Sequence, residues 1–404
     1  MPEYNTLDDL EPGQRVLVRV DLNSPVEDGV VQDNNRFDRY AETVAALADD
    51  DHKVVLMAHQ GRPGRDDFVS LDQHAEILEG YVGKPINFVD DIYGDDAIDA
   101  IEGLDAGEIL LLENTRMADD ELPEKPAEEH AESDFVQTLA PLFDAFVNDA
   151  YSAAHRAHAS TVGFAVELPT YAGLVMDREY QYNTSVAEKE FDGQVTMLCG
   201  GNKSEDVISV VNNLEDKVDT FLVGGLPGEL FLRAEGEPVG MDVGGMDLLD
   251  DQWEETKDTL EDLVENRRDE FELPVDFAYE DENGERAEIS LDDIDEKDTG
   301  YLDIGHETIE AYEPIIRESE AVFVKGAVGV FEDERFADGT VELIEAIGET
   351  DCFSVVGGGD TARTLSLYGL DEDDYDHVSI AGGAYLNALT GQELVVVDVL
   401  KKYA

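Results

Sequence analysis

Short apolar runs alternate with longer amphipathic stretches along most of the chain. The runs are nearly continuous in Val, Leu, Ile and Ala, which is typical of strands that are covered on both faces. Stretches such as Phe37–Asp49 and Leu71–Tyr81 have the apolar spacing of amphipathic helices. The alternation predicts an α/β fold in which parallel sheets are flanked by helices. The expected strands are 15–20, 53–58, 108–113 and 145–148 in the first half, and 195–199, 220–223, 321–324, 352–356 and 378–380 in the second.

The length of the chain, 404 residues, exceeds that of one ordinary domain, so two sheets with one in each half are the economical arrangement. A boundary is expected near Pro169, which gives domains at 1–172 and 173–390. The polar stretch Met176–Lys189 is predicted to be a helix that connects the two halves. The acidic, glycine-containing stretch Asp281–Asp298 is predicted to be an exposed loop or a short pair of strands.

Composition changes this picture mainly through charge. The sequence has 97 Asp and Glu residues against 27 Lys and Arg residues, a formal net charge of −70. These acids are spread over every segment. The alternative, an acidic tail that binds a partner, would concentrate them in one segment. Because the Debye length shrinks to ~3 Å at molar salt, we predict a halophilic surface whose self-repulsion is screened. Nucleic acids and anionic membranes are disfavoured as partners, since both require a basic footprint.

The two cysteines, Cys199 and Cys352, lie inside apolar stretches, which is typical of buried thiols in a reducing compartment. The sequence contains no run of ~18 apolar residues, which a membrane span would require. Its N-terminal residues lack the features of a signal peptide. We therefore expect a cytoplasmic protein.

Polar side chains follow the expected strands of the first half, where the carboxyl ends of parallel strands meet at one edge and bind ligands. Four arginines collect there, and the planar fork of an arginine fits phosphate and carboxylate groups. The sequence thus predicts a pocket for a small, highly anionic substrate. Its candidate residues are Asp21, Asn23, Arg36, His59, Arg62, Asn114, Arg116, His155 and Arg156. As alternatives, the arginines pair with the abundant carboxylates, and Asp21 and Asn23 are only turn residues.

The second half carries glycine loops after two expected strands. Gly200, Gly201 and Lys203 follow the first, and the run Gly357–Thr361 follows the second. Glycines let the backbone approach a phosphate, and the N-terminus of the following helix offers free N–H groups. Asp360 would then lie where it could hold Mg²⁺ on those phosphates. An ordinary tight turn is the alternative, while the absence of P-loop, dinucleotide-binding and protein-kinase motifs disfavours those classes.

Several segments occur in the order and approximate spacing of phosphoglycerate kinase, and from about residue 14 onward the chain resembles this family. The segments are VLVRVDLNSP, AHQGRPG, LLENTR, NDAYSAAHRAHAS, YLDIG, GVFE and GGGDTA. The resemblance implies a monomer of two Rossmann-like domains joined by a hinge, with the tail from about 391 to 404 packed on the first domain. It also implies glycolytic, reversible phosphoryl transfer from 1,3-bisphosphoglycerate to ADP, giving 3-phosphoglycerate and ATP with Mg²⁺.

The resemblance also assigns roles to individual residues. Those implied to bind phosphoglycerate are Asp21, Leu22, Asn23, Arg36, His59, Gln60, Gly61, Arg62, Arg116 and Arg156. Those implied to bind the nucleotide are Lys203, Glu332, Gly357, Gly358, Gly359, Asp360 and Thr361. Asp360 is also implied to bind the metal ion. Arg36 and Lys203 would act on the transferring group. Val207 departs from the family, where many members have a second lysine, and Lys325 stands where an asparagine is common.

The split of the candidate residues between the halves implies that they close on each other for transfer, since the partners must meet in line. The hinge candidates are 176–189 and 301–306. A non-catalytic nucleotide- or metabolite-binding protein is the main alternative. It would require neither Arg36 nor Lys203 to face a transferred group. A structural assembly protein would not require an arginine cluster.

Overall fold

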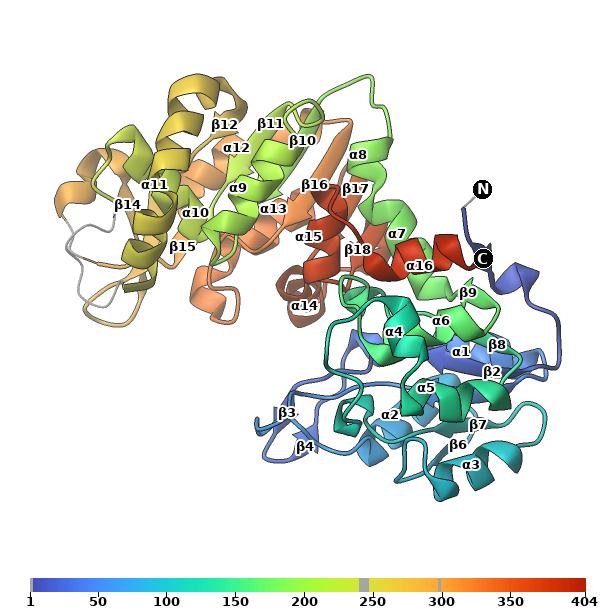
Figure 1. The fold of residues 1–404 in the computed structure, drawn as a ribbon. Helices are drawn as coiled ribbons and strands as arrows, with labels where there is room; N and C mark the ends of the chain where they lie inside the picture. The colour runs from blue at the N-terminus through green and yellow to red at the C-terminus, as the bar shows by residue number, and fades with distance from the viewer. Residues whose placement is uncertain (1–2, 240–246, 297–298) are drawn as a thin grey trace. The chain divides into compact units, whose positions relative to one another are not determined.

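The computed structural model describes residues 3–239, 247–296 and 299–404, and it divides into two compact units. Unit 1 comprises Met1–Gln181 together with Gln392–Ala404, and unit 2 comprises Tyr182–Gly391 (Figure 1). The division falls within one helix, α7 (Leu174–Asn183).

Unit 1 is built on a seven-stranded sheet with the strand order β1-β9-β8-β2-β5-β7-β6, in which every pair is parallel. The strands are β1 (Asn5–Thr6), β2 (Arg15–Arg19), β5 (Lys53–Met57), β6 (Ile86–Phe88), β7 (Ile109–Leu111), β8 (Ala145–Asn148) and β9 (Thr170–Ala172). A small hairpin joins β3 (Val26–Glu27) to β4 (Val30–Val31). The helices are α1 (Asn35–Asp49), α2 (Asp72–Val82), α3 (Asp95–Glu102), α4 (Ala127–Ala131), α5 (Asp134–Leu139), α6 (Phe164–Glu167) and α16 (Val395–Lys402).

Unit 2 repeats the plan with a six-stranded parallel sheet of order β12-β11-β10-β16-β17-β18. Its strands are β10 (Val195–Cys199), β11 (Thr220–Val223), β12 (Phe271–Glu272), β16 (Ala321–Lys325), β17 (Phe353–Gly357) and β18 (His377–Ser379). A second, antiparallel sheet contains β13 (Asp276–Glu280), β14 (Arg286–Ser290) and β15 (Asp303–Ile304). The helices are α8 (Ser185–Glu188), α9 (Ser204–Asn213), α10 (Gly225–Glu235), α11 (Asp247–Arg267), α12 (His306–Glu318), α13 (Asp338–Gly348), α14 (Gly359–Tyr368) and α15 (Gly383–Leu389).

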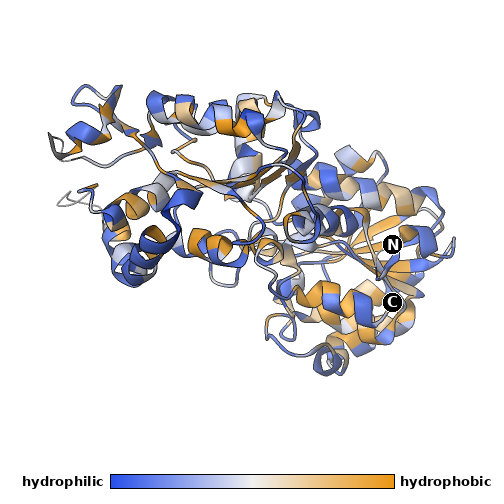
Figure 2. Ribbon diagram, turned by 90° about the horizontal axis from the view of Figure 1, so that it is seen from above, coloured by the Kyte–Doolittle hydropathy of each residue, from blue (hydrophilic) through white to orange (hydrophobic). Residues whose placement is uncertain are grey.

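The α/β class predicted from the apolar runs is confirmed, and all nine expected strands are present. Three of them, β8, β10 and β11, have the predicted bounds. The pattern fails at or next to the edges of the sheets, where β1, β6, β9 and β12 are only two or three residues long and leave no periodicity to detect. Figure 2 shows hydrophobic residues gathered on the strands and on the covered sides of helices, and hydrophilic residues on outer turns and loops.

The acidic stretch 281–298 lies in the antiparallel sheet of unit 2. It contains the turn of the β13–β14 hairpin, strand β14 and the 3₁₀ segment Leu291–Glu296, whereas residues 297–298 lie outside the described residues. The described part of this stretch therefore contributes one strand of a hairpin, whose partner β13 precedes it, instead of the predicted pair of strands.

The C-terminal helix α16 belongs to unit 1. Its residues Val396, Val397 and Leu400 are buried, and the amide of Val396 donates to the carbonyl of Ala154 over 3.0 Å. The ammonium of Lys401 donates to the Tyr180 hydroxyl over 3.0 Å. In the described part of the chain, no helix has both the length and the apolar character that a membrane span requires.

Candidate active site

The carboxyl edge of the unit 1 sheet is organised around a buried carboxylate. Asp21 follows β2, is 3% exposed, and accepts hydrogen bonds from the Arg36 guanidinium and the Ser152 hydroxyl. Its other oxygen lies 3.8 Å from Nδ1 of His59. Burial alone would raise the pKa of Asp21, but Arg36, the Ser152 hydroxyl and Arg19 together hold it well below its usual range. Asp21 is therefore a fixed anion among cations.

Arg36 is positioned by the start of helix α1. The side chain of Asn34 caps the helix by accepting from the Arg36 amide over 3.0 Å, so the arginine leaves the first turn toward Asp21. Its guanidinium also donates to Ser152 Oγ over 3.0 Å. Burial lowers the pKa of Arg36, but the neighbouring Asp21 carboxylate outweighs it and the net shift is upward. About a quarter of the side chain (24%) remains exposed, which leaves donors available to a ligand.

A second arginine, Arg19, lies beneath this edge and was missed by sequence reasoning. It is the last residue of β2, is 1% exposed, and donates from Nε to Ser160 Oγ over 2.8 Å. The Ser160 hydroxyl in turn donates to Glu121 over 2.6 Å. The only sequence signal for Arg19 is a cation inside the otherwise apolar run 16–20.

Arg19 also fixes the protonation of His59. Its guanidinium lies 3.0 Å from His59 Nδ1, and because arginine can only donate, Nδ1 must accept. Burial lowers the pKa of His59 well below its ordinary value, and the surrounding arginines act in the same direction. His59 is therefore a neutral imidazole whose proton is on Nε2, a nitrogen that can donate to a ligand.

The loop after β5 is shaped by Gln60 and Gly61. Gln60 is fully buried, and its side-chain oxygen accepts from the Ser24 amide at 2.8 Å and from His74 Nε2 at 2.9 Å. Gly61 has a φ of 63°, and a Cβ there would lie 2.2 Å from the carbonyl oxygen of Asp67. Both residues thus hold the loop in shape, and the side chain of Gln60 is occupied by protein partners.

Asn23, Leu22 and Arg116 are tied to the same loop. The side-chain oxygen of Asn23 accepts from the Gly61 amide over 2.8 Å, and the Gly61 carbonyl accepts from the Arg116 guanidinium. Leu22 is fully buried, and its carbonyl accepts from the Ser24 hydroxyl over 2.9 Å. The edge is therefore connected through backbone and side-chain bonds from β2 to the 3₁₀ turn Thr115–Met117.

Three arginines at this edge have no carboxylate partner among the described residues: Arg62, Arg116 and Arg156. Arg116 is 6% exposed, and its Nε is shielded from solvent without a hydrogen bond. Burial lowers the pKa of Arg116 to about 10, and the charges of Arg156 and Arg19 add to the effect. The alternative that these arginines only pair with the abundant carboxylates therefore holds for Arg36. It does not hold for Arg62, Arg116 and Arg156. Cations that repel one another at one edge favour a bound anion.

In unit 2 the first glycine loop joins β10 to α9. The Gly201 amide donates to the Ala327 carbonyl over 2.6 Å, and a Cβ on Gly200 would lie 2.3 Å from the same oxygen, so two loops meet backbone to backbone. Lys203 is exposed at the start of α9, and its ammonium has no partner in the described part of the chain. This side chain is free to meet a ligand.

The two departures from the family lie beside this loop. Val207 is fully buried in α9. Lys325 ends β16 and forms an ion pair of 2.9 Å with Asp206. The positive charge of Lys325 is therefore partly neutralised by a neighbour on α9.

The second glycine loop joins β17 to α14. Gly358 caps the helix with a φ of 107°, a conformation that favours glycine, and a Cβ on Gly357 would lie 2.0 Å from the Tyr385 ring. Thr361 is buried and donates to the Gly357 carbonyl over 3.1 Å. Asp360 is exposed in the first turn. The loop presents the open N-terminus of α14 and one free carboxylate side by side, a combination that suits phosphates and a hard divalent cation.

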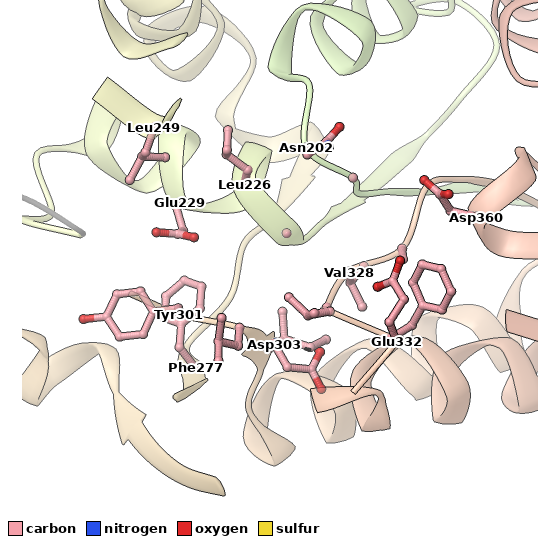
Figure 3. Close-up of a pocket in the computed structure, with 18 of the residues that line it drawn as sticks. Asn202, Leu226, Glu229, Leu249, Phe277, Tyr301, Asp303, Val328, Glu332 and Asp360 are labelled. Carbon is pink, nitrogen blue, oxygen red and sulfur yellow. Dashed lines mark hydrogen bonds between the residues drawn. The ribbon is translucent and has the colours of Figure 1, made fainter. Parts of the chain in front are cut away.

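A cavity of about 410 Å³ opens next to this loop within unit 2. Two of the predicted nucleotide residues, Glu332 and Asp360, line it, and Figure 3 shows both on one side of the cavity. Glu332 is half exposed and lies 3.6 Å from the Arg363 guanidinium. The opposite side is formed by Leu249, Phe277, Tyr301 and Glu229. The cavity thus has a polar end near the glycine loop and a mainly apolar end away from it.

Comparison with known proteins places these features in a family. The family model described as "Phosphoglycerate kinase" matches residues 7–392. A phosphoglycerate kinase of Halorubrum lacusprofundi is 65% identical, over 100% of this chain and 99% of that protein, and one of Haloarcula marismortui is 61% identical over 99% and 100%. The crystal structure of the Pyrococcus horikoshii phosphoglycerate kinase superposes with a TM-score of 0.92 at 33% identity and covers 99% of both chains.

Proposed function

Since the chain belongs to the phosphoglycerate kinase family, we propose that unit 1 binds the phosphoglycerate and unit 2 the nucleotide. The reaction is the reversible transfer of a phosphoryl group between 1,3-bisphosphoglycerate and ADP, which gives 3-phosphoglycerate and ATP. The chain is accordingly a transferase of glycolysis.

The assignment of unit 1 rests on its unpaired arginines. Arg62, Arg116 and Arg156 lie at one sheet edge without carboxylate partners among the described residues, and Arg116 is buried with a lowered pKa. A phosphoglycerate carries a carboxyl or acyl phosphate group at one end and a phosphate at the other, and this substrate would neutralise the mutual repulsion. His59 Nε2–H and the Asn23 amide add neutral donors for its oxygen atoms.

The assignment of unit 2 rests on the loop from Gly357 to Thr361. The phosphates of ADP or ATP would lie against the N-terminus of α14, and Glu332 would hold the ribose hydroxyls. Asp360 would hold Mg²⁺, for which its exposed carboxylate at the phosphate-binding turn is a fitting hard donor. When bound, the ion neutralises charge on the nucleotide phosphates.

Transfer itself would depend on Arg36 and Lys203. Both side chains keep donors that no described carboxylate fully occupies, and the Asp21 carboxylate holds the Arg36 guanidinium in place. In the proposed mechanism the two units close around both substrates, the phosphoryl group passes in line, and closure excludes water that would hydrolyse the acyl phosphate. Arg36 and Lys203 would then stabilise the charge on the moving group from the two sides.

We further propose that the protein works as a monomer in a salty cytoplasm. The dispersed acids, a net charge of −70, support the salt requirement, and the free, buried Cys199 and Cys352 fit a reducing compartment. The free energy of unfolding should rise as KCl increases from millimolar to molar concentration. A fall over that range, measured by urea unfolding, would contradict the halophilic assignment.

The proposed catalytic assignment is tested by a coupled assay in about molar KCl with Mg²⁺, ATP and 3-phosphoglycerate. We expect Arg36→Ala to lower kcat by about a hundredfold or more, as for other donors to a transition state, while ADP affinity is unchanged. Lys84→Ala is the control, since this lysine of unit 1 pairs with Asp49 at the surface. A folded Arg36→Ala enzyme with full activity would refute the role of Arg36. A folded wild type without activity would favour the non-catalytic binding protein.

A further inference from the structure

The apolar end of the unit 2 cavity contains one acidic side chain, Glu229. It lies on helix α10, is 6% exposed and lines the cavity. Figure 3 shows its carboxyl group directed from α10 into the cavity, between Leu249 on one side and Tyr301 on the other. The Oε2 atom is shielded from solvent and has no hydrogen-bond partner among the described residues. Burying a polar atom without a hydrogen bond is unfavourable, and a ligand that supplies the missing hydrogen bond would remove this cost.

The nearest protein candidate for a partner is Arg233, one helical turn later on α10. Two of its nitrogens bond elsewhere, with Nε donating to the Val239 carbonyl over 2.6 Å and Nη1 donating to Asp250 over 2.9 Å, while Nη2 is buried without a hydrogen bond. No ion pair within 4.0 Å joins Arg233 to Glu229 in the described part of the chain. Burial raises the pKa of Glu229 to about 8, against the smaller opposing effect of Arg233, so at neutral pH the group is largely a carboxylic acid.

The position of Glu229 in the cavity indicates which part of a ligand it would meet. Asp360 and the N-terminus of α14 lie at the other end, where phosphates fit. The walls near Glu229 come from Leu226, Leu249, Phe277 and Tyr301, which form an apolar and aromatic surface suited to a flat base. A nucleotide with its phosphates at Asp360 would therefore present its base to Glu229.

We propose that Glu229 is a specificity-determining residue that hydrogen-bonds the 6-amino group and a neighbouring ring nitrogen of adenine. The inference rests on the proposed binding of the nucleotide in this cavity. A carboxylic acid presents one donor and one acceptor side by side, and adenine presents the complementary pair: an acceptor nitrogen beside an amino donor. Both oxygen atoms of Glu229 gain partners, and the ligand supplies the bond that the protein lacks.

The test compares ADP with purine riboside 5′-diphosphate, which keeps the ring nitrogens and phosphates and lacks the 6-amino group. Binding to the full chain is measured by calorimetry in about molar KCl with Mg²⁺. We expect wild type to bind ADP about tenfold more tightly, the effect of one buried hydrogen bond. Glu229→Gln should keep this preference, because an amide also offers a donor beside an acceptor. Glu229→Met, which keeps the unbranched shape without hydrogen bonds, should bind both ligands alike.

The other outcomes are equally decisive. The preference should survive in the control Glu261→Met, an exposed position on α11. Equal affinity of wild type for both ligands, or an undiminished preference in Glu229→Met, would overturn the inference. A change in melting temperature alone, with the preference intact in every variant, would make Glu229 a structural residue. Failure of wild type to bind either diphosphate would refute the nucleotide site itself, and the inference with it.

Discussion

Units 1 and 2 place their candidate ligand groups at the same topological position, beyond the carboxyl ends of parallel strands, but they build the sites in opposite ways. In unit 1 the groups are side chains fixed in a buried network: Arg19, Asp21, His59 and Arg116 are each less than a tenth exposed. In unit 2 the backbone of two glycine loops forms the site, and Lys203, Glu332 and Asp360 are exposed around it.

The difference follows from what each unit would bind. A small acid with charges at both ends can be matched by several cations held at fixed positions, and fixing them requires buried partners such as Asp21 and Ser160. The phosphates of a nucleotide can be met by backbone N–H groups at a helix N-terminus, which need glycine instead of a side-chain network. Substitutions in unit 1 should thus affect both folding and binding, whereas those at the exposed residues of unit 2 should affect binding alone.

The largest effect should come from Asp21→Asn. The change leaves the Arg36 and Arg19 cations without their central anion, and removing one partner of a buried pair typically lowers the free energy of unfolding by about 3–5 kcal/mol. Urea unfolding in about molar KCl measures this loss. Asp360→Asn is the matched change in unit 2, and it should stay within about 0.5 kcal/mol of wild type while weakening nucleotide binding with Mg²⁺. Equal losses in both variants would remove the contrast between the units.

Lys203→Met tests whether an exposed group of unit 2 contributes to activity without contributing to stability. Its ammonium is exposed without a partner among the described residues, so we expect kcat to fall by about a hundredfold with the unfolding free energy unchanged within about 0.5 kcal/mol. The coupled assay and urea unfolding are run on the same preparations. Lys217→Met, which removes a surface lysine paired with Glu190, should change neither quantity. A large loss of stability in Lys203→Met would show that unit 2 also depends on a side-chain network.

The sequence predicted the sheets better than it predicted the network beneath the site. The strands of both sheet centres follow from continuous apolar runs, since burial on two faces leaves a strong pattern. Arg19 could not be assigned because its partners, Ser160 and Glu121, lie far away along the chain. Glu229 is one of 97 acids, and only the packing of α10 against the cavity distinguishes it. The ligands assigned to each candidate residue stay predictions.

The pH dependence of stability should differ in sign between two buried carboxyl groups, Glu229 in unit 2 and Asp21 in unit 1. The pKa of Glu229 is raised to about 8, so the folded chain keeps a proton that the unfolded chain releases near pH 4, and the unfolding free energy falls as pH rises between these values. The slope is at most about 1.4 kcal/mol per pH unit. The lowered pKa of Asp21 acts oppositely: its contribution is complete above about pH 4 and is lost only as the pH falls below that. Urea unfolding from pH 5 to 8 should therefore show the unfolding free energy of Glu229→Gln increasing relative to that of wild type as pH rises. A difference between the two proteins that stays constant with pH would contradict the raised pKa.

The smallest effects should come from two buried hydroxyl groups, one in each unit. Ser160 links Arg19 to Glu121, and Thr361 donates to the carbonyl of Gly357. Removing either hydroxyl should lower the unfolding free energy by about 1 kcal/mol, the usual contribution of one hydrogen bond. Their kinetic effects should separate, because Ser160→Ala loosens the support of His59 and Thr361→Ala loosens the glycine loop. The KM for 3-phosphoglycerate should rise severalfold in the first and the KM for ATP in the second. If each substitution raised both constants equally, the two units would not divide substrate binding between them, and the different construction of their sites would need another cause.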